Sequence, residues 1–327
     1  MSELEDPVTT LLRLITTRIT VTKDSGSHAS ILASREAYDR ELLKEYDAQI
    51  TLALDSSQDQ KLELAGRLRR RFMIFRCNTY SVDKAAPGSD AGKVMRDKVT
   101  AQINAIIREN RTLPYQTAYN FAGLGYPSGD PHKAFAAGAA TELAPSSISW
   151  VELTNLEYQG IWYSDDVRFS KSHSVNTQYA LMLFRFKIGS REQCVKKLVL
   201  SFEGYGTAPS GNGVTVKVWN HAVSAWQQAQ TGTGSGDETI TITLLADWPN
   251  FIDSSGYVWV LARTTNPSNG TTPAVVYCDF VQLTIQVYGI TYCDVVSYRN
   301  IDVTDVKPYL CRTEFLLKGW LFESISG

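Results

Sequence analysis

The pattern of hydrophobic and polar residues divides the chain into terminal segments that mix helices with strands and a middle segment that predicts strands alone. Near the N-terminus, apolar residues recur at helical spacing from Val8 to Ile15, directly after Asp6-Pro7, a pair suited to begin a helix. Residues 91–110 show the clearest helical pattern, with one apolar stripe from Met95 to Ile107, and Ser89 or Asp90 could cap this helix.

Two strands are predicted between these helices. Residues 46–54 alternate as a half-buried strand does, and residues 69–80 are apolar on both faces around Phe72–Phe75, which is typical of a central strand. Residues 58–69 could form a short helix between the two. The first part of the chain therefore predicts a small layer of helices on a sheet.

Strand candidates recur through the middle of the chain from Ile148 onward. They occupy residues 148–153, 178–188, 194–205, 213–220, 238–245, 257–263 and 274–289, and turns rich in Gly and Ser separate most of them. Short strands in this number predict a β-sandwich or jelly roll. Residues 113–147 have no steady period and many Gly, Pro and Ala, which favours a long linker or an extended arm.

The end of the chain predicts one more long strand. In residues 305–325, Phe315 and Leu317 fall on one face and Glu314 and Lys318 on the other. A hairpin is the alternative to a single strand. Because the N-terminal layer has only two clear strands, we expect residues 295–325 to complete its sheet. The predicted fold class is α+β, with a small α/β layer domain formed by residues 1–140 together with 291–327. An all-β sandwich or jelly-roll domain, residues 145–290, is inserted in it.

Composition narrows the class of protein. Hydrophobic residues make up 43% of the chain and charged residues 20%, which indicates a soluble globular protein, and a net charge of −2 gives no basic field to attract nucleic acid. No apolar run is long enough to span a bilayer, so we expect no membrane partner, and the acidic N-terminus does not resemble a secretory signal. The five cysteines are scattered, and buried thiols are favoured over disulfides or metal ligands.

Motifs for catalysis are absent from the sequence. The four histidines are isolated, there is no GxSxG or HExxH motif, and the glycine-rich loop 231–237 lacks the Lys of a phosphate-binding loop and leads into a strand. We therefore expect no enzyme and no cofactor. An alternative is a carboxylate-based enzyme that uses Asp165 and Asp166 with Glu157 or Glu203.

Three sets of residues are candidates for binding. The basic run Arg67, Arg69, Arg70 and Arg71 could face DNA or a neighbouring subunit, although nearby acids favour a plain charge cluster. Trp162, Tyr163, Trp219 and Trp226 could stack on sugar rings, although strand alternation explains most tryptophans as core. Asp165 and Asp166 could hold calcium, with solvated charge as the plain alternative.

The order of segments 6–15, 46–54, 69–80, 92–110 and 309–325 resembles the tail-terminator and neck proteins of tailed viruses of bacteria or archaea. The resemblance implies a non-enzymatic virion structural protein, assembled in the host cytoplasm as a homo-oligomeric ring, a hexamer, at the head–tail junction. Its partners would be other copies of itself, neighbouring neck and tail-tube proteins, and DNA passing through the lumen.

Members of that family are about half as long as this chain, and the extra length is the inserted sandwich. In a ring, the sandwich would have to face outward. The alternative hypothesis is a carbohydrate-binding or adhesion protein whose sandwich binds glycans on a host surface.

Overall fold

The computed structural model describes residues 3–35, 38–63, 68–84, 89–126, 129–303, 305 and 307–324. The chain forms two compact units. The terminal unit comprises Leu4–Thr117 and Tyr288–Gly327, and the sandwich unit comprises Ala118–Val287 with Met1–Glu3. The sandwich unit therefore begins at Ala118, earlier than the residue 145 expected from the sequence.

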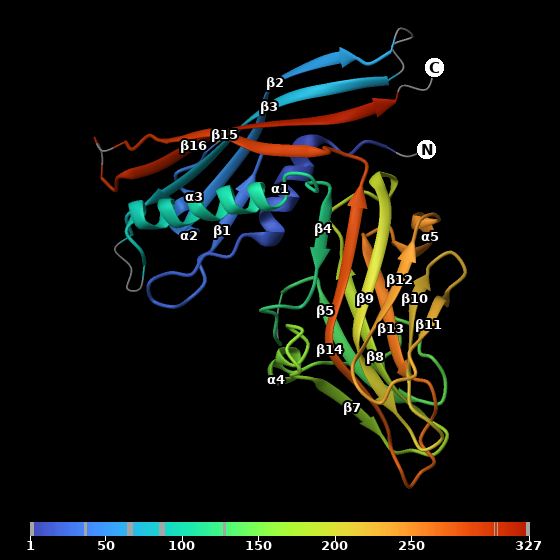
Figure 1. Ribbon diagram of the computed structural model, residues 1–327. Helices are drawn as coiled ribbons and strands as arrows, with labels where there is room; N and C mark the ends of the chain where they lie inside the picture. Colours follow the sequence, from blue (N-terminus) through green and yellow to red (C-terminus); the bar gives the residue numbers. More distant parts are fainter. Residues whose placement is uncertain are drawn as a thin grey trace. The chain divides into compact units, whose positions relative to one another are not determined.

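The terminal unit consists of a five-stranded sheet with helices on one face (Figure 1). Its elements are α1 (Pro7–Arg18), β1 (Ile31–Ser34), α2 (Leu42–Glu45), β2 (Ala48–Lys61), β3 (Leu68–Val82), α3 (Gly92–Glu109), β15 (Tyr292–Asn300) and β16 (Leu310–Ser324). The strand order is β1-β2-β3-β16-β15, with β1 parallel to β2 and every other pair antiparallel. Apolar residues of α1 and α3 pack with those of the sheet in one core, including Leu11, Ile103, Phe75 and Phe315.

The starts of the two long helices are satisfied in different ways. Asp6 caps α1 as predicted, because its side chain accepts a hydrogen bond from the N–H of Thr9 (2.8 Å). The predicted cap of α3 is wrong, since neither Ser89 nor Asp90 fills that role. Asp83 instead accepts a hydrogen bond from the N–H of Gly92 (2.6 Å), which ties the helix start to the end of β3.

The C-terminal strand lies where the sequence placed it. β16 pairs with β3 over its whole length, from Leu310 opposite Val82 to Ser324 opposite Leu68. Phe315 and Leu317 are buried on the helix side, while Lys318 is exposed on the other. The end of the chain is therefore a central strand of the N-terminal sheet.

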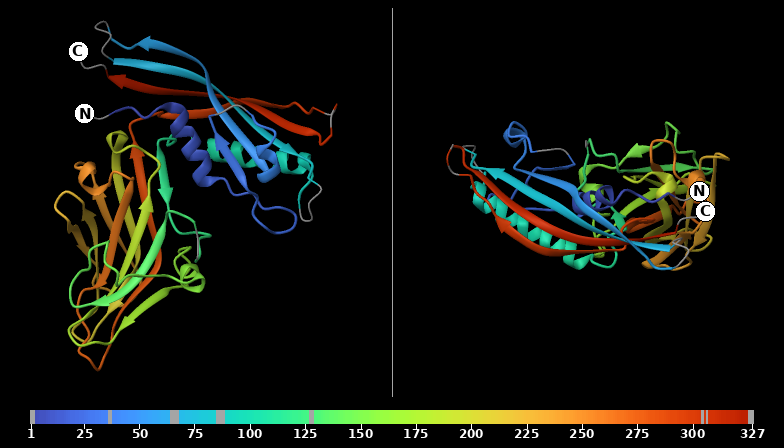
Figure 2. Two further views of the ribbon diagram at one scale, coloured as in Figure 1. Left: turned by 180° about the vertical axis from the view of Figure 1, so that it is seen from behind. Right: turned by 90° about the horizontal axis from the view of Figure 1, so that it is seen from above.

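The short helix expected over residues 58–69 is wrong, because β2 continues as a strand to Lys61. Ladder pairing with β3 runs from Gln49 opposite Tyr80 to Lys61 opposite Arg69, and it satisfies the backbone groups that a helix would otherwise pair. The half of β2 from Leu54 onward is exposed, and the far ends of β2, β3 and β16 continue past the helices (Figure 2).

The sandwich unit is formed by a six-stranded sheet, in the order β11-β10-β13-β8-β5-β6, and a second sheet, in the order β12-β9-β14-β4, with β7 beside β14 (Figure 1). The strands are β4 (Gln116–Tyr119), β5 (Lys133–Ala139), β6 (Val151–Glu152), β7 (Phe169–His173), β8 (Tyr179–Lys187), β9 (Val195–Thr207), β10 (Val214–Asn220), β11 (Ala225–Thr231), β12 (Glu238–Leu244), β13 (Tyr257–Thr264) and β14 (Ala274–Val287). Short helices α4 (Asn155–Gln159), η1 (Glu192–Cys194) and α5 (Trp248–Phe251) join some of them.

The linker expected over residues 113–147 is wrong, because this segment contains β4 and β5. The alanines of β5 are small enough to lie in the middle of the packed sheet, where Ala134 and Ala136 are buried and pair with Phe184 and Met182 of β8. The small alanine side chains therefore hide the strand pattern in the sequence, and the same small size lets β5 pack closely in the sheet.

The cysteines are buried, as predicted. Each of the five is a free thiol, and burial raises the pKa of the Cys77 thiol to about 12. Among the described residues, no helix is both long and apolar enough to cross a membrane.

Candidate functional site

The outer face of the six-stranded sheet carries aromatic side chains. Successive side chains of a strand point to opposite faces. In β13, Val258 and Val260 are fully buried toward the second sheet, so Tyr257 and Trp259 lie on the outer face, where both are half-buried. Trp219 lies on the same outer face, since the preceding Val218 is fully buried.

Five side chains of this face form what we term the cross-strand row. It consists of Trp226, Trp219, Trp259, Arg185 and Lys133, on β11, β10, β13, β8 and β5. Trp219 pairs with Trp226, and Arg185 pairs with both Trp259 and Lys133. Val218 lies opposite Val260, which places Trp219 beside Trp259. Adjacent strands are about 4.8 Å apart, so the row spans about 19 Å.

A loop covers one flank of the row. Glu142 accepts hydrogen bonds from Lys217 and Arg263, both at 2.7 Å, and the indole N–H of Trp226 donates to the carbonyl of Leu143 (2.9 Å). The indole N–H groups of Trp219 and Trp259 have no hydrogen-bond partner among the described residues. The loop thus fixes the Trp226 end and leaves the two central tryptophans open to a ligand.

The other flank carries positive charge. The Arg185 guanidinium lies 4.8 Å from the ring centre of Tyr257 and 5.6 Å from that of Trp259, and the Lys187 ammonium lies 5.1 Å from that of Tyr257. Arg185 donates to the carbonyl of Pro131 (3.0 Å), and Lys187 donates to that of Ser255. In the part of the chain that the structure describes, neither cation has a carboxylate partner.

The remaining cations of this face each contact a carboxylate. Lys133 pairs with Glu152 (2.8 Å), and Lys217 and Arg263 share Glu142. A cavity of about 450 Å³ opens beyond Lys187, with polar lining that includes Ser190. Among the described residues, the cations of this face that lack a carboxylate partner are therefore those beside Tyr257 and Trp259.

The sequence-predicted sugar-stacking residues separate in space. Trp226 belongs to the cross-strand row, whereas Trp162 and Tyr163 lie in the loop between α4 and β7 and contact each other, with ring centres 6.2 Å apart. The indole N–H of Trp162 donates to the carbonyl of Leu124 (2.8 Å). Sequence reasoning did not single out Trp259, because an alternating strand does not reveal which of its faces is open.

The basic run lies on β3 where the strand passes beyond the core. Arg67 lies outside the described residues. Arg71 pairs with Asp59 (2.9 Å) and Glu323 (2.8 Å), and Arg69 lies 3.8 Å from Asp59. The Arg70 guanidinium packs against aromatic rings on the opposite face of the strand. The described arginines thus have partners within the chain, and their contact with DNA or another subunit stays a prediction.

The two candidate calcium ligands have different surroundings. Asp165 accepts a hydrogen bond from the N–H of Val167 (3.1 Å) within its own turn. Asp166 has a positive φ of 66° and pairs with Arg168 (2.7 Å). Asp166 also lies near Asp237 and Asp279, two residues distant in sequence that no motif connected to it.

Comparisons with known proteins concern the sandwich unit. A family model described as "Uncharacterized protein, C-terminal domain" matches residues 134–287. No curated protein matches the chain. The family model does not name a tail-terminator or neck protein, so that resemblance stays a hypothesis.

Several solved structures match part of the chain at low similarity. The xylan-binding module CBM15 is 11% identical, with a TM-score of 0.30, over 52% of this chain and 97% of that chain. Winged bean acidic lectin complexed with methyl-α-D-galactose is 9% identical, with a TM-score of 0.29, over 53% and 99%. A Family 16 Carbohydrate Binding Module-2 is 13% identical, with a TM-score of 0.24, over 39% and 99%. Likeness at this level carries no argument about function.

Proposed function

We propose that the sandwich unit is a non-catalytic glycan-binding module and that the glycan, which carries acidic groups, lies along the cross-strand row. The observation that carries this proposal is the half-buried pair Trp219 and Trp259 on the outer face of the sheet. Their half-buried rings and free indole N–H groups lie on the solvent side of a sheet whose inner side already forms a core.

Tryptophan suits this role because it combines a large apolar face with a polar N–H at its edge. A sugar ring is amphipathic in the same sense, since its C–H groups form an apolar face and its hydroxyl groups form a polar rim. A row of about 19 Å across five strands matches an extended oligosaccharide better than a single sugar.

The acidic preference follows from Arg185 and Lys187. Neither has a carboxylate partner among the described residues; Arg185 lies against Tyr257 and Trp259, and Lys187 lies against Tyr257, the strand neighbour of the row. A guanidinium binds carboxylate or sulfate groups strongly, because its planar donors match their oxygens. A uronic acid or a sulfated sugar would supply the missing counter-charge.

The carboxylates of this face are consistent with a site that binds a glycan without hydrolysing it. Glu142 and Glu152 are each held in ion pairs with lysine or arginine, so neither is arranged as a free acid and base pair. We therefore propose that this face binds a glycan and does not cleave it.

A glycan array probed with the full chain tests the proposal. We expect binding to acidic oligosaccharides that weakens as salt rises, because charged contacts at a surface are screened. The double variant Arg185→Gln/Lys187→Gln should lose the acidic preference, and the same change at the exposed Lys44 and the half-buried Lys171 should not. An absence of glycan binding, or an unchanged preference in the double variant, would contradict it.

A second candidate function is self-association through the terminal unit. On the sheet face opposite the helices, the rings of Tyr292 and Trp320 stack at 3.8 Å, and Phe72 lies 6.4 Å from Trp320. Phe72 and Phe322 are 36% and 49% exposed. Arg70 lies 4.5 Å from the ring centres of both Phe72 and Trp320. Exposed aromatic residues around an arginine are typical of protein interfaces.

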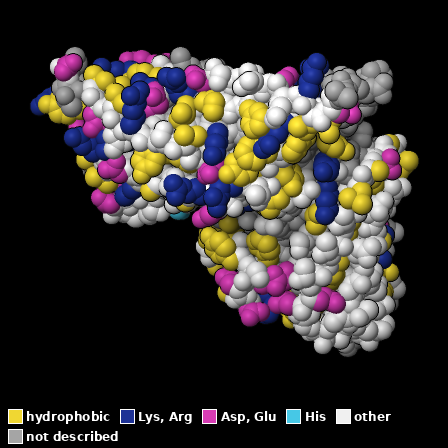
Figure 3. Space-filling model, turned by 45° about the horizontal axis from the view of Figure 1, so that its top comes forward, with side chains coloured by type: hydrophobic (Ala, Val, Ile, Leu, Met, Phe, Trp, Pro, Cys, Tyr) yellow, Lys and Arg dark blue, Asp and Glu magenta, His cyan; other side chains and the backbone are white. Residues whose placement is uncertain are grey.

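A second copy of the chain is the partner that fits this face. In the view of Figure 3, basic, acidic and hydrophobic side chains are interleaved over the terminal unit, which suits a surface that contacts its own copy. Sedimentation velocity should show an oligomer that Phe72→Ser/Phe322→Ser dissociates, whereas Leu156→Ser, at a 77% exposed position of the sandwich unit, should not. A wild-type chain that stays monomeric at high concentration would contradict this candidate.

A further inference from the structure

Asp279 is placed by an irregularity in β14. In the pairing with β9, Cys278 lies opposite Gly204 and Phe280 lies opposite Glu203, so Asp279 is an extra residue in a β-bulge. A bulge re-aims a side chain, and here both Cys278 and Asp279 point into buried space. Asp279 is only 1% exposed, which is rare for a carboxylate without a compensating charge.

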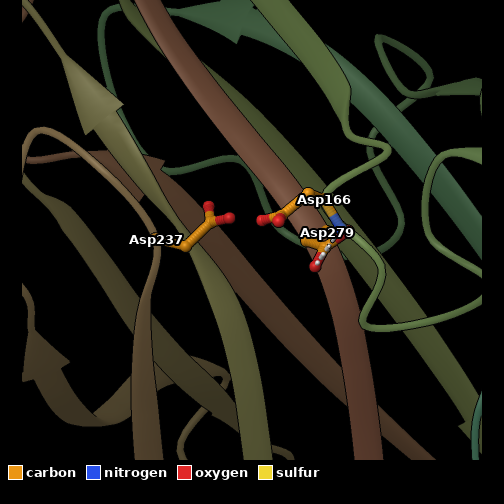
Figure 4. A group of neighbouring side chains, drawn as sticks. All are labelled: Asp166, Asp237 and Asp279. Carbon is orange, nitrogen blue, oxygen red and sulfur yellow. Dashed lines mark hydrogen bonds between the residues drawn. The ribbon is translucent and has the colours of Figure 1, made fainter.

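Two further carboxylates converge on Asp279. Asp166 comes from the loop before β7, and Asp237 comes from the loop before β12. One carboxylate oxygen from each of the three residues lies within 4.8 Å of the others. Figure 4 shows the carboxylates of Asp166 and Asp237 facing each other, with Asp279 beside Asp166.

The buried carboxylates are incompletely satisfied. Asp279 Oδ2 accepts a hydrogen bond from the N–H of Asp166 (3.3 Å), but Asp279 Oδ1 is buried without a hydrogen-bond partner among the described residues. Asp237 Oδ1 is buried and unpartnered in the same way. An unpartnered buried oxygen costs free energy, so a cation that contacts both oxygens would stabilise the cluster.

Arg168 supplies only part of the required charge. Its guanidinium contacts Asp166 (2.7 Å) and donates through Nε to Asp237 (2.7 Å). Desolvation, with the charges of Glu203 and Asp237, raises the pKa of Asp279, which has no cation of its own. The cluster thus has three carboxylates for one guanidinium.

We propose that Asp166, Asp237 and Asp279 hold a calcium ion. Calcium prefers oxygen ligands at about 2.3–2.6 Å and tolerates irregular geometry, and two oxygens each about 2.4 Å from one ion are at most about 4.8 Å apart. The separations in the cluster meet this limit. Asp166 is exposed, so water and the ion reach the cluster from its side. The ion would tie two loops to the bulge of β14 and stabilise the sandwich unit.

Calcium titration of the chelator-treated full chain tests the proposal by calorimetry and thermal unfolding. We expect one calcium bound per chain and a rise in Tm with calcium, because a ligand that binds only the folded state stabilises it. Asp279→Asn and Asp237→Asn should each weaken calcium binding on the order of 10- to 100-fold. Asp247→Asn is the matched control, since Asp247 is exposed and, like Asp166, has a positive φ.

A further variant distinguishes a calcium site from a cluster of carboxylates whose charge is balanced by Arg168 alone. Arg168→Gln removes the competing cation, so calcium should bind it more tightly than it binds the wild type. If Asp279→Asn does not fold, Asp237→Asn and Arg168→Gln still decide the matter. No calcium dependence of Tm in the wild type, an equal response to magnesium, or equal weakening in Asp247→Asn would overturn the proposal.

Discussion

Glu142 shows how one carboxylate shapes the proposed binding face. It holds the loop over the sheet through Lys217 and Arg263, and it is only 22% exposed. Burial acts to raise the pKa of Glu142, but the hydrogen bonds from the two cations outweigh it, so the net pKa lies below the ordinary value. The pKa of Glu142 is lower in the folded chain than in the unfolded chain, where it is about 4.3. The ion pairs of Glu142 therefore stabilise the fold fully above a pH of about 4.3, and this stabilisation is lost as the pH falls through the folded-state pKa.

Glu142→Gln is therefore expected to destabilise the sandwich unit at neutral pH by about 1–3 kcal/mol, the usual contribution of hydrogen bonds to charged groups. The difference from wild type should shrink as the pH falls below about 4.3. Urea unfolding at several pH values measures this. Asp247→Asn, which alters an exposed acid, should track the wild type. A pH-independent difference for Glu142→Gln would mean that the ion pairs do not hold the loop.

Among the elements, the bulge in β14 depends on a close approach between the backbones of β9 and β14. Gly204 lies opposite Cys278, directly before the bulge, and a Cβ on Gly204 would be 2.1 Å from the carbonyl oxygen of Tyr277. Real side chains do not approach this closely, so any other residue must push β9 and β14 apart. The bulge that directs Asp279 into the acidic cluster thus requires a glycine across from it.

Gly204→Ala should destabilise the sandwich unit by about 1–3 kcal/mol, as overpacking does, and should also weaken calcium binding. Gly236→Ala is the control, because a Cβ there meets nothing within 4 Å. Thermal unfolding with and without calcium measures both effects. Equal stability of the two variants would show that β9 and β14 can separate without cost.

Elements with a strong period could be predicted from the sequence. The helices α1 and α3 and the strands β8, β9, β10, β13 and β14 follow their apolar patterns. The alternation of β16 predicted its buried face, and the small number of strands in the N-terminal layer predicted that it joins that sheet, but its place beside β3 was not predicted. The outer half of β2 could not be predicted, since polar residues 56–61 form a strand only through pairing with β3. The strand β5 could not be predicted either, because its alanines show no alternation of apolar and polar residues. It becomes a strand through its pairing with the neighbouring strands.

The candidate sites were less accessible to sequence reasoning than the fold. Trp226 was identified, but its row depends on register between strands, which no single segment contains. Asp279 does leave a signal, because a lone acid interrupts the apolar run of β14. Its partners Asp166 and Asp237 are too distant in sequence to be connected without the pairing of β9 and β14.

In the whole molecule, the chain leaves the terminal unit after Thr117 and returns to it at Tyr288. The first and last segments share one core, and the two sheets of the sandwich bury a separate set of apolar residues, including Phe184, Val260 and Leu283. Both units have an aromatic sheet face, and in each an arginine lies against a tryptophan ring, Arg185 with Trp259 and Arg70 with Trp320. The sandwich face differs because it carries tryptophans on three neighbouring strands, β11, β10 and β13. We therefore propose ligand recognition for the sandwich unit and self-association for the terminal unit.

The affinity of tryptophan variants for an acidic oligosaccharide, measured by calorimetry, tests the central claim most directly. Trp259→Ala should raise Kd about 30-fold, because an aromatic anchor at the centre of a binding face contributes about 2 kcal/mol. Trp162→Ala, which removes a tryptophan from the α4–β7 loop, should bind as the wild type does. Unchanged affinity in Trp259→Ala, or loss of binding in Trp162→Ala instead, would contradict a glycan site on the cross-strand row.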